Sequence, residues 1–257
     1  MDYDNILISK KDTVLTISIN RPNQLNALNM VTILELHDAI AAANLTKVIR
    51  AIIITGAGSR AFIAGADIKE FVHFDQEQGG VLAKNGHDLL FNFIENSSIP
   101  VIAAINGFAL GGGLELALAS HIRVASDNAK MGFPEVSLGL IPGYGGTQRL
   151  PQLVGKGKAM EMILTANMIT ALEAKECGLV NHVVTQEELM PLAQKLASKI
   201  AFNSNTAIAT AIETINTSFD TSKNGFEEEI LNFGKCFETL DFKEGTAAFL
   251  EKRKPNF

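Results

Sequence analysis

Cysteine is scarce in this 257-residue chain, which carries only Cys177 and Cys236. No CxxC pair occurs, and the five histidines show neither HxH nor HExxH spacing. The sequence therefore predicts neither a disulfide framework nor a metal site. Because disulfide bonds are typical of oxidising compartments, their absence also favours a reduced, cytoplasmic setting.

Positive charge is limited as well, since 22 lysines and arginines stand against 28 aspartates and glutamates, a net charge of −6. The longest basic run is the triplet at 252–254. This balance argues against nucleic acid as a general partner. No G-x-S-x-G motif occurs, which weighs against an α/β-hydrolase. The first residues also lack the basic start and apolar run of a signal peptide.

Long uninterrupted apolar runs are absent too. The nearest candidate is 99–122, in which Glu115 is the only charge. Glycines at 107 and 111–113 interrupt its middle, so we expect no membrane-spanning helix there. Nine of the 21 glycines lie between Gly107 and Gly146. A lone carboxylate inside a glycine-rich apolar stretch is the most unusual feature of the sequence.

Apolar periodicity predicts alternating strands and helices in the first 145 residues and mainly helices beyond Gly146. We expect a helix from about Ile68 and a loop from His73 to Gly86. Strands are expected at 6–8, 14–19, 51–55, 101–105, 121–125 and 179–184. Helices are expected at 29–44, 114–120, 146–164, 170–177, 186–202, 204–217 and 223–239. The pattern is that of an α/β core with a helical C-terminal part.

The segment 56–61 (GAGSRA) matches the dinucleotide-binding fingerprint G-x-G-x-x-G/A. That fingerprint requires a helix to begin inside it and an acidic residue about 20 positions further on. Neither is predicted here, so a nicotinamide-dependent oxidoreductase stays a remote alternative. A turn is the better interpretation of Gly56 and Gly58.

The triplet 111–113 precedes a predicted helix that carries Glu115 in its first turn. Such a junction exposes backbone N–H groups at the positive end of the helix dipole, where an anion or a developing oxyanion can bind. A tight turn with an acidic dipole partner is the alternative. Since the neighbours of Glu115 are uncharged, we expect a desolvated carboxylate, and such groups are often functional.

Glu135 is a second isolated carboxylate, the only charge between Met131 and Gln148. Alone it would be taken for a surface-loop residue. Two such groups can divide acid and base roles if their environments separate their pKa values. The 20 positions between Glu115 and Glu135 allow a strand and a turn that would bring them face to face.

At this point the motifs identify a family. The chain resembles the enoyl-CoA hydratase/isomerase, or crotonase, superfamily, and within it a bacterial-type enoyl-CoA hydratase. The resemblance covers nearly the whole chain and rests on 20–22 (NRP) with 25–29 (LNALN), 56–71 (GAGSRAFIAGADIKEF), 105–116 (INGFALGGGLEL), 132–135 (GFPE) and 140–150 (LIPGYGGTQRL).

The resemblance implies a fold of repeated ββα turns that form a spiral core over residues 1–200. It also implies a C-terminal helical region, 201–257, that assembles the chain into a homotrimer or a dimer of trimers. The expected ligand is an acyl-CoA thioester, with coenzyme A part of the substrate and no separate cofactor. The implied oxyanion donors are the backbone N–H groups of Ala66 and Gly112. The implied substrate contacts are Ala64, Ala66, Asp67, Ile68, Lys69, Gly112 and Gly143, with Phe249 and Lys252 reaching a neighbouring subunit's CoA.

The implied reaction is the reversible hydration of a 2-enoyl-CoA to a 3-hydroxyacyl-CoA, the work of a hydro-lyase. In this interpretation Glu115 positions and activates water, and Glu135 protonates C2. An enoyl-CoA isomerase or another acyl-CoA lyase of the superfamily is the alternative, although typical isomerases lack one glutamate. A non-catalytic or RNA-binding member is a third possibility, disfavoured by the charge. The acyl pocket wall is expected at 72–85 and Tyr144.

Overall fold

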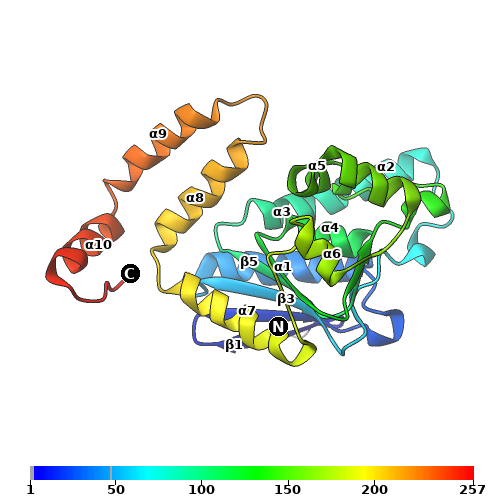
Figure 1. The fold of residues 1–257 in the computed structure, drawn as a ribbon, viewed down its shortest axis with the longest axis horizontal. Helices are drawn as coiled ribbons and strands as arrows, with labels where there is room; N and C mark the ends of the chain where they lie inside the picture. Colours follow the sequence, from blue (N-terminus) through cyan, green and yellow to red (C-terminus); the bar gives the residue numbers. More distant parts are fainter. Residues whose placement is uncertain (1–2, 47) are drawn as a thin grey trace.

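The computed structural model describes residues 3–46 and 48–257. Within that part of the chain, two β-sheets lie side by side with helices around them (Figure 1). The larger sheet has the strand order β1 (Ile6–Lys11), β2 (Val14–Ile19), β3 (Ala51–Gly56), β5 (Val101–Ile105), β7 (Ile122–Ser126) and β10 (His182–Val184). The smaller sheet has the order β4 (Ala61–Ile63), β6 (Phe108–Leu110), β8 (Lys130–Gly132) and β9 (Ile169–Thr170).

The chain alternates between the two sheets. β3, β5 and β7 join the larger sheet in parallel, and each is followed within a few residues by β4, β6 and β8 in the smaller sheet. A helical segment then returns the chain to the next strand of the larger sheet. These repeated ββα turns build a spiral, and they place the segments that follow β4, β6 and β8 next to one another.

The helices differ in what they cover. They are α1 (Met30–Thr46), α2 (Gln76–Gly86), α3 (Asn92–Glu95), α4 (Gly112–Ala119), α5 (Gly146–Thr165), α6 (Ala171–Glu176), α7 (Gln186–Ala201), α8 (Asn205–Thr217), α9 (Gly225–Cys236) and α10 (Leu240–Glu251). A π-helical turn, η3 (His87–Phe91), joins α2 to α3. α7 packs its buried Leu189, Ala193 and Ala197 on the larger sheet. Figure 1 shows α8, α9 and the C-terminal helix α10 as an arm that extends away from the two sheets.

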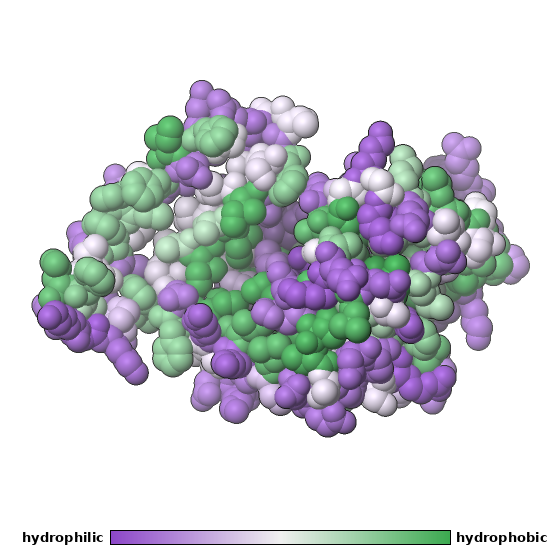
Figure 2. Space-filling view, viewed as in Figure 1, coloured by the Kyte–Doolittle hydropathy of each residue, from purple (hydrophilic) through white to green (hydrophobic). Residues whose placement is uncertain are grey.

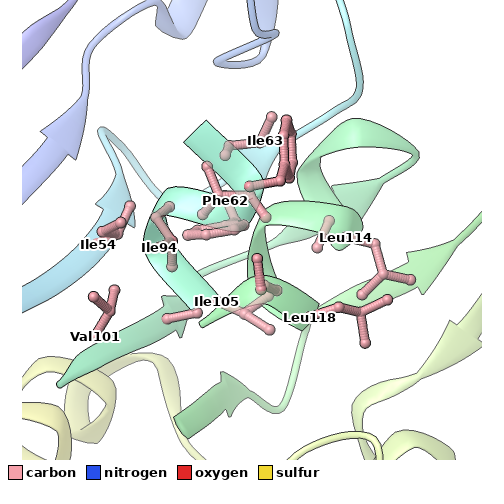
Figure 3. Close-up of a cluster of buried hydrophobic side chains, with 14 of the residues drawn as sticks. Ile54, Phe62, Ile63, Ile94, Val101, Ile105, Leu114 and Leu118 are labelled. Carbon is pink, nitrogen blue, oxygen red and sulfur yellow. The ribbon is translucent and has the colours of Figure 1, made fainter. Parts of the chain in front are cut away.

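The main core includes residues of both sheets and of the helices packed against them. Figure 3 shows α4 at its centre, where Leu114 and Leu118 lie among apolar side chains of β3, β4, β5 and α3. Every residue of α4 is buried. Because α4 is enclosed on all sides, its N-terminus is fixed relative to both sheets, and Glu115 is fixed with it.

Two local expectations were wrong. Residues 73–86 are not a loop, because α2 begins at Gln76 after an Asp75 capping box in which Asp75 and Gln78 exchange hydrogen bonds. The helix expected from Ile68 is only a 3₁₀ turn, η2 (Ile68–Glu70). The cap was readable in the sequence, but two glycines in the helix interior weaken the helical pattern.

The fingerprint segment 56–61 forms the connection between β3 and β4, and a strand rather than a helix follows it. A dinucleotide site of the expected kind is therefore excluded. None of the helices in the described residues is long and apolar enough to cross a membrane. The expected division of the chain at residue 200 falls one residue before the end of α7 and stays a prediction.

Gly113 offers a test of the tight packing of α4. A Cβ on Gly113 would overlap the carbonyl oxygen of Ile63 in β4. We expect Gly113→Ala to destabilise the fold by about 1–3 kcal/mol, because α4 would have to move in a packed core. Thermal and urea unfolding measure this change.

Gly157 in α5 is the matched control, since nothing lies within 4 Å of a Cβ there. Gly157→Ala should leave stability unchanged or raise it by ~0.5–1 kcal/mol, because alanine loses less backbone entropy in a helix. Equal stability of the two variants would contradict the packing argument.

Candidate active site

One cavity of about 690 Å³ contains both glutamates. Its walls come from residues 64–68, the first turn of α4, the segment 134–144, and one face of α2 with the turn before it. Phe71, Phe74, Leu82, Leu140 and Ile141 make most of the wall apolar. A second hollow of about 710 Å³, bounded by α3, α5 and α8, has mostly polar residues around it and contains neither glutamate. The first cavity is therefore the candidate active site.

Glu115 lies in the first turn of α4 and is only 1% exposed. Its Oε1 accepts hydrogen bonds from the backbone N–H groups of Tyr144 and Gly146, each at 2.8 Å. Gly146 is the first residue of α5, so this carboxylate also lies at the positive end of a second helix dipole. No described residue donates to Oε2, and this oxygen is free to bind a ligand in the cavity.

Burial dominates the electrostatics of Glu115 and raises the pKa of its carboxyl to about 7. The two N–H donors at Gly146 and Tyr144 oppose that rise, because they favour the ionised form. The nearby charge of Glu135 adds to it, and that of Arg149 subtracts from it. The carboxyl can therefore exchange a proton near neutral pH.

Glu135 follows β8 and opens the 3₁₀ turn η4 (Glu135–Leu138). Its Oε2 is buried without a hydrogen-bond partner among the described residues. Its Oε1 occupies the space beside Gly111, where a Cβ would overlap it. Burial raises the pKa of this carboxyl as well. The structure thus brings the two predicted carboxylates into one cavity and leaves one oxygen of each without a protein donor.

Ala66 and Gly112 both line this cavity. Ala66 pairs with Leu28 in an isolated parallel β-bridge. The bridge is made by the residues on either side of Ala66: the Leu28 N–H donates to the carbonyl oxygen of Gly65, and the Asp67 N–H donates to the carbonyl oxygen of Leu28. The Ala66 N–H points the other way, and no described residue accepts from it. Gly112 begins α4, and a Cβ on Gly112 would lie 3.8 Å from the nitrogen of Ala66. Ala66 and Gly112 are therefore neighbours in space.

The other predicted contacts divide into two groups. Ala64, Ile68 and Gly143 line the cavity. Asp67 and Lys69 do not, and the carboxylate of Asp67 is paired with Arg21 at 2.9 Å. That ion pair joins the segment 64–68 to the turn after β2.

Phe249 and Lys252 are not brought to the cavity within one chain. Phe249 belongs to α10 and is 83% exposed, and Lys252 caps the C-terminus of that helix. Both lie on the arm, away from the two sheets (Figure 1). Any contact with a ligand would have to be made in another copy of the chain.

Sequence reasoning missed the residues that support the site. Arg149 in α5 and Asn26 in the turn before α1 are both buried and polar, yet neither was singled out. Asn26 receives the Arg21 N–H and donates to the carbonyl groups of Ala57 and Ala61. The only feature of the sequence that pointed to Arg149 and Asn26 was that each is a polar residue inside one of the long motifs. Within residues 3–46 and 48–257, no group of three His, Cys, Asp or Glu side chains could hold a metal ion.

Comparison with known proteins identifies the chain. Residues 9–257 match the sequence profile of Enoyl-CoA hydratase/isomerase. The chain belongs to the enoyl-CoA hydratase/isomerase family. It is 46% identical to crotonyl-CoA hydratase of Syntrophomonas wolfei, over 100% of this chain and 99% of that protein. It is 45% identical to short-chain-enoyl-CoA hydratase of Clostridium acetobutylicum, over 99% and 97%.

Solved structures of the family share the fold. The crystal structure of enoyl-CoA hydratase from Bacillus anthracis superposes with a TM-score of 0.91 at 40% identity, and the match covers 99% of each chain. The crotonase fold expected from the motifs is confirmed. The ββα spiral that aligns α4, η4 and the segment 64–68 around one cavity is therefore the family architecture.

The raised pKa of Glu115 predicts a pH-dependent change in stability. A folded-state pKa of about 7, above the ordinary value of 4.5, means that protonated Glu115 favours the fold. Its contribution is full below about pH 4.5 and is lost as pH rises through 7. Glu115→Gln should therefore be more stable than wild type at pH 8, by up to ~3 kcal/mol, with the difference vanishing near pH 4.5. Urea unfolding at several pH values measures it, and a constant difference between the two proteins would contradict the shift.

Proposed function

We propose that the chain is an enoyl-CoA hydratase, a hydro-lyase that adds water reversibly across the 2,3 double bond of a 2-enoyl-CoA. The observation that carries the proposal is a buried carboxylate, Glu115, and a half-buried one, Glu135, that line one cavity, each with an oxygen that lacks a described protein donor. A water molecule held between two such oxygens could hydrogen-bond to both. The names of the similar hydratases support the same reaction.

Glu115 suits the base that activates this water. The N–H groups of Tyr144 and Gly146 hold Oε1 and stabilise the ionised carboxylate. Oε2 then accepts a proton from water while the water oxygen bonds to C3 of the substrate. Because the pKa of Glu115 is raised to about 7, this carboxylate is a stronger base than an ordinary glutamate while about half of it is still ionised at neutral pH.

Glu135 suits the acid that protonates C2. No described residue donates to its Oε2, and burial raises its pKa, so this carboxyl holds a proton more readily than an exposed glutamate does. The N–H groups of Ala66 and Gly112 would bind the thioester oxygen, which gains negative charge as C3 is attacked. Proton exchange through the new hydroxyl group or solvent restores both glutamates. Coupled carboxylates titrate together, so the two apparent pKa values in the pH profile of activity belong to the pair and not to either glutamate alone.

The substrate proposed is a short 2-enoyl thioester of coenzyme A. Tyr144 forms the inner wall of the cavity, with its ring stacked on Phe91 at a centroid distance of 4.6 Å. The ring fills the space that Gly86 leaves open, since a Cβ there would overlap it. A long acyl chain would have to displace this packed ring. No separate cofactor enters the proposal, and this expectation stays a prediction.

The arm supports a proposed homotrimer or dimer of trimers. Figure 2 shows apolar side chains along it, and ten large apolar residues of the arm are exposed. They are Ile215, Phe219, Phe226, Ile230, Leu231, Phe233, Phe237, Leu240, Phe249 and Leu250. Such a surface would be covered in an assembly. Phe249 and Lys252 would then contact the CoA of a neighbouring copy. The cytoplasmic location stays a prediction.

The first test is activity. Purified protein should hydrate crotonyl-CoA, followed by loss of the enoyl-thioester absorbance. Glu115→Gln and Glu135→Gln should each lower kcat by ~10²–10⁴-fold while leaving the fold intact, because an amide neither accepts nor delivers the proton. Near wild-type rates in both variants would show that the carboxylates are structural. Movement of the double bond of a 3-enoyl-CoA without hydration of crotonyl-CoA would instead favour the isomerase alternative.

The second test concerns acyl length. Tyr144→Ala should raise kcat/KM for six- and eight-carbon 2-enoyl-CoA relative to crotonyl-CoA, by ~10-fold or more, because the inner wall recedes. Tyr144→Phe is the matched control, since it keeps the ring and should keep the wild-type preference. An unchanged preference in Tyr144→Ala would place the end of the acyl site elsewhere.

A further inference from the structure

Arg149 lies directly behind the loop that holds Glu115. It is the fourth residue of α5 and is 7% exposed. Its Nη1 donates to the carbonyl oxygen of Tyr144 at 3.0 Å. The Tyr144 N–H and the Gly146 N–H, on either side of that carbonyl, are the two donors to Glu115. The guanidinium therefore fixes the orientation of the loop that presents both donors.

The guanidinium is itself held from the opposite side. Its Nε and Nη2 bind the two carboxylate oxygens of Glu95 at 2.9 and 2.6 Å, and Nη2 also binds Oδ1 of Asn92 at 2.8 Å. Glu95 and Asn92 belong to α3, which is packed in the main core. A bidentate pair of this kind fixes direction as well as distance. A continuous series of hydrogen bonds therefore connects α3, through Arg149 and the 144–146 loop, to Glu115.

Gly145 shows that the backbone is built around this contact. It has a φ of 103°, and a Cβ on it would overlap Nη1 of Arg149. A side chain at this position would push the guanidinium away from the Tyr144 carbonyl. The loop geometry and the position of Arg149 therefore require each other.

We propose that Arg149 is a positioning residue for Glu115, holding the 144–146 loop so that two N–H groups converge on Oε1 and Oε2 stays directed at the water. This role rests on the proposed hydratase reaction, in which Glu115 is the base. The groups that face Glu115 and carry or can carry charge are Glu135 on η4, Tyr144 on the loop and Arg149 itself. Of these only Arg149 is positive.

The first experiment compares Arg149→Met with Arg50→Met. Arg50 is a part-buried arginine that likewise binds main-chain carbonyl groups, at Ala201 and Phe257, far from the cavity. Arg149→Met should lower kcat on crotonyl-CoA by ~10–100-fold and move the acid limb of the kcat/KM profile up by about one pH unit. The direction follows because both the cation and the fixed donors lower the pKa of Glu115. Arg50→Met should lower the melting temperature without moving the profile.

Equal pH profiles and kcat in wild type and a folded Arg149→Met would overturn the proposal and leave Arg149 a purely structural residue. Two conservative variants keep the test decisive if Arg149→Met does not fold. Arg149→Lys retains the positive charge but not the planar set of donors that binds Glu95 and the Tyr144 carbonyl together. Glu95→Gln retains Arg149 but weakens the bidentate ion pair that holds it. Both should lower kcat several-fold. Full activity in both would also overturn the proposal.

A titration separates this proposal from the proposed reaction. Carbon-13 NMR of glutamate-labelled protein, with Glu115→Gln to assign the signal, measures the pKa of Glu115 without substrate. That pKa should rise in Arg149→Met and stay unchanged in Arg50→Met. If wild type fails to hydrate crotonyl-CoA, the reaction is wrong, yet the titration still decides whether Arg149 controls Glu115. An unchanged pKa in Arg149→Met would overturn the positioning role.

Discussion

The hydrogen bonds from Tyr144 and Gly146 to Glu115 join the two halves of the site. Glu115 belongs to a helix enclosed by the core, and its two donors belong to a loop at the start of α5. Without this carboxylate the loop would have two unpaired buried N–H groups. Without the loop the carboxylate would be a buried charge with no donor, which is costly. Each side is therefore stable only in the presence of the other.

The same contact explains the balance of acidity in the cavity. Full burial without donors would keep Glu115 protonated and useless as a base, whereas several more donors would make it a weak base. Two N–H groups and one distant guanidinium leave the pKa near 7. The Oε2 of Glu135 has no described donor, and only its own backbone N–H opposes the rise of its pKa, so two residues of one chemical type have different environments within one cavity.

The sequence was sufficient to find Glu115 and Glu135, because an isolated carboxylate among glycines and apolar residues is visible without coordinates. It was also sufficient to predict most strands of the larger sheet, because they are rich in β-branched and apolar residues and the central ones, such as Val101–Ile105, are nearly continuous apolar runs. The strands of the smaller sheet were not predicted, because three-residue strands such as Ala61–Ile63 have no measurable period. α10 was missed as well, and α2 was taken for a loop. Arg149 could not be recognised because its partners, Glu95 and Tyr144, are brought to it only by the spiral.

Tyr144 contributes to the site through both its main chain and its side chain, so the two contributions cannot evolve at separate positions. Its main-chain N–H donates to Glu115, and its ring lines the cavity, stacked on Phe91. Under the proposed function, replacing this ring to admit larger acyl groups would also remove the packing on Phe91 that supports the peptide donating to Glu115. Divergence toward new substrates at this position is therefore expected to pass through catalytically weakened intermediates unless a second change, in the loop or at its support, accompanies it.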